Sequence, residues 1–113
     1  MAPVTLPKAA SAWLPVVGWA AAIFALSSIP SLSSGTSFDF VLRKAAHMTE
    51  YAILGALLWR ALRDELAAFY GGVLYAATDE LHQAFVRGRH GSPKDIGFDA
   101  IGVAVGLLLV RRP

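Results

Sequence analysis

Three polar clusters interrupt an otherwise apolar chain, and their residue types suit proton transfer or metal binding. The clusters are Lys44, His47, Glu50 and Tyr51; Asp79, Glu80, His82 and Gln83; and Asp95 and Asp99. Spacings of three and four residues place most members of each cluster on one helical face, with Glu80 turned about 100° from Asp79. Carboxylates beside imidazoles can act as acids and bases, because burial and like charges separate their pKa values.

Two clusters pair a histidine with a carboxylate three residues away. His47 precedes Glu50, and Asp79 precedes His82. Helical bundles build metal sites from such inward-facing groups, and mixed nitrogen and oxygen ligands suit Zn, Mn or Fe better than Mg or Ca. Three alternatives stay open: a divalent metal bound by these four residues, a metal-free functional network, and structural pairing of each histidine with a carboxylate.

The same residues could perform catalysis or bind a ligand. The candidate acid–base residues are Asp79, Glu80, His82, His47 and Glu50. No serine or cysteine nucleophile stands at a recognisable spacing, so a hydrolase would have to use water or a carboxylate. The candidate ligand-binding residues are Lys44, Tyr51, Gln83, Arg89, Asp95 and Asp99. Arg89 could hold a phosphate or carboxylate, or equally form a salt bridge to Asp95 or Asp99, and Asp95 also fits a helix-capping position after Ser92.

The composition indicates where these clusters must lie. The chain has 113 residues, enough for one small domain over 1–113, with 56% hydrophobic and only 16% charged residues. Soluble domains carry about 25% charged residues, so most of this surface is expected to face lipid. The net charge of +2 and the absence of a basic patch argue against nucleic acid as a partner, and without cysteine there is no disulfide.

Four apolar stretches predict an all-α bundle of four transmembrane helices, at about 13–29, 38–62, 66–86 and 93–110. Pro15 is placed in the first turn of the first helix, and a cleaved signal peptide is the alternative for that stretch. A soluble four-helix protein is a further alternative. Gly102 and Gly106 suit close helix packing below the polar clusters, or a homo-oligomer contact.

Helical rise converts sequence spacing into depth in the membrane. Glu50 lies about 9 Å beyond Lys44, Asp79 about 12 Å before Arg87, and Asp99 about 7.5 Å beyond Lys94. The second and fourth helices enter from the side at which the third leaves, so the three clusters should form one pocket. We expect this pocket to open toward the loops 30–43 and 87–94. Lysines and arginines divide five against five between the two sides, and we place the termini in the cytoplasm because the terminal-side charges have no other task.

The order of these motifs resembles the VanZ-like family over roughly residues 40–107. The residues that carry the resemblance are Lys44-Ala-Ala-His-Met-Thr-Glu-Tyr51, Asp79-Glu-Leu-His-Gln83, Phe85, Arg89, Asp95, Asp99 and Gly102. The resemblance implies a small multi-pass protein of the bacterial cytoplasmic membrane, in a family named for teicoplanin resistance. It implies no particular reaction.

Two functional hypotheses follow for the predicted pocket. In the first, the pocket binds an amphiphile, such as the head group of an envelope lipid or peptide, and affects envelope composition or teicoplanin susceptibility. In the second, the chain is a membrane-embedded enzyme that acts on a lipid-linked or phosphorylated substrate. Membrane lipids, a lipid-linked ligand and a second copy of the chain are the expected partners.

Overall fold

The computed structural model describes residues 8–28, 37–85 and 93–110, and these residues form four helices and no strand. In chain order, the helices are α1 (Lys8–Ser27), α2 (Ser37–Leu62), α3 (Glu65–Ala84) and α4 (Pro93–Val110). The prediction of an all-α fold is confirmed. The bounds of α2, α3 and α4 agree with the predicted helices to within two residues.

Helix α1 differs from its prediction at both ends, because it begins at Lys8 and ends at Ser27. Alanines after Lys8 are strong helix formers and extend the helix toward the N-terminus. Pro15 therefore lies inside α1, and the expectation of a first-turn proline was wrong. Proline has no N–H, so the carbonyl of Ser11 loses its helical donor, which is the usual consequence of an interior proline.

The connection between α2 and α3 consists of Arg63 and Asp64. Arg63 has a φ of 57°, in the left-handed region, and its N–H donates to the Trp59 carbonyl at 2.7 Å. The side chain of Asp64 then accepts from the Ala67 N–H at 3.0 Å and caps the start of α3. This short link makes α2 and α3 antiparallel neighbours.

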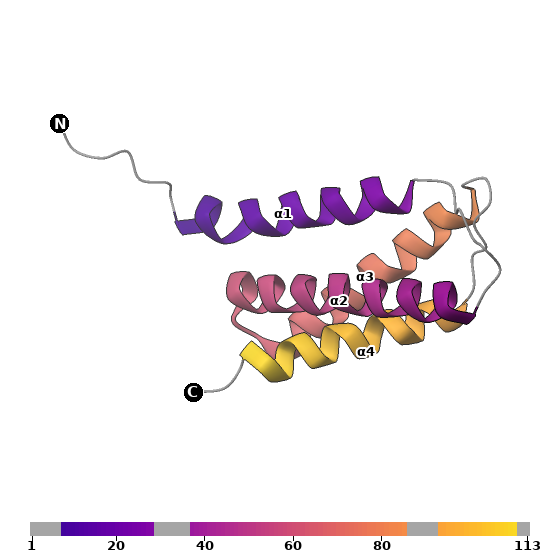
Figure 1. Ribbon diagram of the computed structural model, residues 1–113. Coiled ribbons are helices and arrows are strands. Elements are labelled where there is room, and N and C mark those ends of the chain that lie inside the picture. Colours follow the sequence, from indigo (N-terminus) through magenta and orange to yellow (C-terminus); the bar gives the residue numbers. More distant parts are fainter. Residues whose placement is uncertain (1–7, 29–36, 86–92, 111–113) are drawn as a thin grey trace.

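Helices α2 and α4 lie side by side, with α3 inclined behind them and α1 along the other side of α2 (Figure 1). The α2–α4 contact is the most extensive in the bundle. It depends on glycine, because a Cβ atom on Gly102 would lie 2.5 Å from the Met48 carbonyl oxygen. The predicted close packing at Gly102 and Gly106 is confirmed, and it occurs within the chain. A homo-oligomer stays a prediction.

The buried core is small, and large apolar side chains cover the outside of the bundle. Tyr51, Leu54 and Val103 are almost fully buried, whereas Leu74 is 68% and Leu109 is 61% exposed. Exposed apolar residues occur on all four helices, which suits a lipid environment. Among the described helices, α1 alone is long and apolar enough to cross a membrane, a property that a signal sequence shares. Crossing of the membrane by all four helices therefore stays a prediction.

Candidate functional site

The polar clusters meet at one end of the bundle. This end contains the last turn of α1, the first half of α2, the second half of α3 and the start of α4 (Figure 1). His47, Asp79 and Asp99 each bring one potential ligand atom within 4.8 Å of the other two. These residues belong to three different helices, and each comes from a different one of the three clusters.

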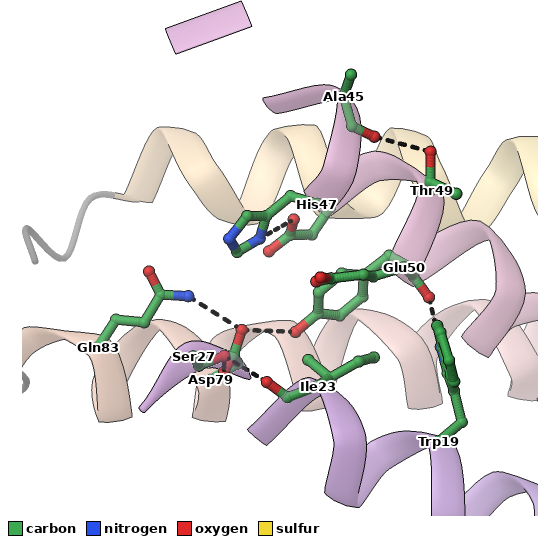
Figure 2. A network of polar contacts seen from close by, with 11 residues as sticks. Trp19, Ile23, Ser27, Ala45, His47, Thr49, Glu50, Asp79 and Gln83 are labelled. Atoms are coloured by element: carbon green, nitrogen blue, oxygen red, sulfur yellow. Dashed lines mark hydrogen bonds and ion pairs between the residues drawn. The ribbon is translucent and has the colours of Figure 1, made fainter. Parts of the chain in front are cut away.

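Asp79 is the centre of the hydrogen-bond network and is only 2% exposed. Its carboxylate accepts from the Tyr51 hydroxyl and from the Gln83 amide, each at 3.1 Å, and from the Ser27 hydroxyl (Figure 2). Three helices thus donate to one buried carboxylate. Ser27 was not among the predicted site residues, because in the sequence it falls at the start of a serine-rich loop. The Ser27 hydroxyl oxygen also lies 2.8 Å from the Ile23 carbonyl oxygen, which is a second acceptor for its proton.

His47 and Asp99 form a second pair beside Asp79. Nδ1 of His47 lies 3.4 Å from Oδ1 of Asp99, and Asp99 is 1% exposed. Both atoms are buried, and within the described part of the chain neither has a partner with hydrogen-bond geometry. Buried polar atoms are usually satisfied, so this pair retains capacity for a further donor, acceptor or cation.

The donor set at this point fits a divalent metal. Two carboxylates and an imidazole are suitable ligands for a transition metal, and the hydrogen bonds to Asp79 would orient that ligand. The predicted ligand set was His47, Glu50, Asp79 and His82, whereas the structure groups His47 and Asp79 with Asp99. The predicted ligands Glu50 and His82 are not part of this group.

His82 faces α1. Its ring stacks on Phe24 with a centroid separation of 4.1 Å, and Nε2 lies 3.3 Å from the Ser28 hydroxyl. Asp79 and His82 are three residues apart on α3, so their side chains point in directions about 60° apart. Helix α1 packs against the side of α3 on which His82 lies. His82 thus borders the network around Asp79 and does not join His47.

Glu80 and Lys44 extend the site, and Glu50 is half-buried beside it. Glu80 is 7% exposed, although its helical position turns it away from Asp79. Nζ of Lys44 lies 5.1 Å from the centre of the Phe98 ring, so its charge lies at the α2–α4 contact. The backbone carbonyl of Glu50 accepts from the Trp19 indole at 2.8 Å, which attaches α1 to α2.

Two predicted ligand-binding residues cannot be placed in this network. Arg89 lies outside the described residues, and Asp95 belongs to the first turn of α4 with its side chain outside the described part. The predicted phosphate contact of Arg89 and its alternative salt bridge therefore both stay predictions.

Comparison with known proteins identifies the family. A family model described as VanZ/LLP1 matches residues 6–112, nearly the whole chain. The chain belongs to the VanZ/LLP1 family. The match includes α1, which lies outside the residues 40–107 that carry the resemblance. No curated protein and no solved structure matches the chain.

Proposed function

We propose that this VanZ/LLP1 family member is a multi-pass protein of the bacterial cytoplasmic membrane that binds the head group of an envelope amphiphile. The family, the apolar helix α1 and the exposed leucines on every helix support the membrane location. In the proposed orientation the termini are cytoplasmic, and the site opens to the opposite face.

One observation carries the binding function. Asp79 is buried and accepts from donors on three helices, and it lies next to a histidine–carboxylate pair whose facing atoms have no hydrogen-bond partner among the described residues. Ionisable groups within a membrane are costly and are usually retained for function. Purely structural pairing would be expected to satisfy His47 and Asp99 fully. Their remaining capacity is better explained by a ligand.

The charges of the site indicate the class of head group. The buried Asp79, Glu80 and Asp99 are acceptors, so they favour a ligand with amino, amide or hydroxyl donors. Lys44 could bind an anionic part of the same head group at the α2–α4 contact. Lipids and lipid-linked peptides combine both features with an apolar tail. Binding of such a molecule would change envelope composition, and through it teicoplanin susceptibility.

The test is mass spectrometry of the amphiphiles that purify with the full chain. We expect the wild type to retain one enriched class and His47→Ala to lose it at least about tenfold, because a hydrogen bond to a charged group contributes about 1.5–3 kcal/mol. Thr49→Ala is the matched control, since Thr49 is on the same helix, exposed, and bonded to its own Ala45 carbonyl at 2.8 Å. Equal retention by wild type and His47→Ala would refute the proposal.

A membrane-embedded enzyme is the second candidate, and the grouping of His47, Asp79 and Asp99 favours it. A metal bound there would polarise a phosphoryl or carbonyl oxygen and lower the pKa of a bound water. His47 and the two aspartates would hold it, and the donors to Asp79 would orient that carboxylate.

The enzyme hypothesis makes a separate prediction about metal content. Elemental analysis of the purified protein should find about one Zn, Mn or Fe per chain, and Asp99→Ala should bind the metal at least about tenfold more weakly. Asp64→Ala is the control, because Asp64 only caps α3 at the other end of the bundle. Wild-type protein that binds no added metal would eliminate the metal-dependent form of this hypothesis and leave the binding function untouched.

A further inference from the structure

A groove lined by residues of α1, α2 and the link after α2 lies at the end of the bundle remote from Asp79. In Figure 1 this is the end where α1 begins and α2 ends. Its volume is about 630 Å³, within the range of small-molecule sites. The polar and aromatic side chains that line it are Lys8, Ser11, Trp13, Arg60 and Arg63. Among the described residues, no acidic side chain lines this groove.

The three cations of this groove are available for an external anion. Within the described part of the chain, Lys8, Arg60 and Arg63 form no ion pair. The nearby acids do not line the groove, and the Asp64 carboxylate already accepts from the backbone of α3. Three positive charges around one groove would repel one another, and an anion relieves that repulsion.

The backbone conformation of Arg63 is unfavourable for a residue other than glycine. Its φ of 57° is the left-handed conformation in which glycine usually ends a helix. The guanidinium lies 4.8 Å from the centre of the Trp59 ring, and Arg63 also lines the groove. A non-glycine residue held in this conformation is a reason to look for function.

We propose that this groove binds the phosphodiester head group of an anionic phospholipid in the cytoplasmic leaflet. The proposal rests on the membrane orientation given under the proposed function. Trp13 is 40% exposed at the groove, and tryptophan is enriched at the head-group level of membranes. The guanidinium groups match phosphate oxygens in pairs, the Ser11 hydroxyl can donate to a third oxygen, and the acyl chains can lie along the exposed apolar faces.

The experiment is native mass spectrometry of the full chain in detergent, with phosphatidylglycerol or phosphatidylcholine added in equal amounts. We expect discrete adducts with phosphatidylglycerol and far fewer with phosphatidylcholine. Each cation near an anionic lipid is worth about fivefold in affinity, so the triple variant K8Q/R60Q/R63Q should bind about a hundredfold more weakly. Arg43→Gln, an exposed cation at the other end of α2, should keep wild-type binding.

Two further measurements test whether lipid binding is lost without loss of the fold, and whether a soluble head group alone can bind. Arg63→Gly relieves the left-handed strain, so it should leave the thermal midpoint unchanged or higher while lowering phosphatidylglycerol binding about fivefold. This variant distinguishes loss of the site from loss of the fold. Soluble glycerol phosphate should neither bind nor compete, because it lacks the apolar tail.

Equal adducts with both lipids, full binding by the triple variant, or competition by glycerol phosphate would each overturn the proposal. If phosphatidylglycerol binding fails these tests while retention of the amphiphile still depends on His47, the proposed function stands. Loss of both would instead contradict the membrane location on which the two proposals depend.

Discussion

Replacing Gly106 with alanine is expected to lower the stability of the bundle by about 3 kcal/mol, the upper range for overpacking a tight contact. The new Cβ would lie 2.0 Å from the Ala52 carbonyl oxygen, and 2.7 and 2.9 Å from the carbonyl carbon and Cα of the same residue. All three are backbone atoms, so no rotamer change can relieve the clash. Helices α2 and α4 would have to separate along the most extensive contact of the fold.

Thermal unfolding in detergent, followed by circular dichroism, measures this effect. At about 4 °C per kcal/mol for a domain of this size, the midpoint should fall by roughly 10 °C or more. Gly97→Ala is the matched control in the same helix, because a Cβ there meets nothing within 4 Å. That variant should be neutral or more stable, since alanine favours helix over glycine. Equal midpoints for the two variants would contradict the α2–α4 packing.

Replacing Asp79 with asparagine is expected to abolish amphiphile retention while the fold survives. The Ser27 hydroxyl has one proton and two acceptors, the Ile23 carbonyl and the Asp79 carboxylate. When asparagine replaces the aspartate, the serine can keep its proton on the Ile23 carbonyl and accept from the new amide. Tyr51 and Gln83 can still donate to the amide oxygen. Only the negative charge is lost.

The assay is the same mass spectrometry of co-purified amphiphiles, together with thermal unfolding. For Asp79→Asn we expect retention to fall at least about tenfold and the midpoint to stay within about 5 °C of wild type. Asp79→Leu should instead be strongly destabilised, because the buried Tyr51 and Gln83 donors lose their acceptor at about 1–3 kcal/mol each. Thr78→Ala is the control: its exposed hydroxyl bonds back to the Tyr75 carbonyl at 2.7 Å, as expected for a threonine within a helix. Full retention by Asp79→Asn would remove Asp79 from the site.

Local sequence patterns predicted the four helices, three of them with bounds within two residues of those observed. Capping and proline signals placed α4 at Pro93–Val110, as observed. A constant rise per residue predicted similar depths for Glu50, Asp79 and Asp99, and the structure groups Asp79 and Asp99 with His47 from the same cluster as Glu50. The order of the motifs also predicted the family. Helical structure and the position of each polar residue along its helix follow from local sequence, because they depend on regular backbone geometry.

The partners within the site were decided by tertiary structure alone. Sequence spacing did not distinguish His82 from Asp99 as the partner of His47. In the structure, Asp99 pairs with His47, and His82 stacks on Phe24. Ser27 entered the network because α1 packs where its last turn reaches Asp79. Which face of a helix meets which neighbour depends on side-chain packing and on how closely two backbones can approach, as α2 and α4 do at Gly102. These are contacts between distant segments, so local sequence patterns do not contain them.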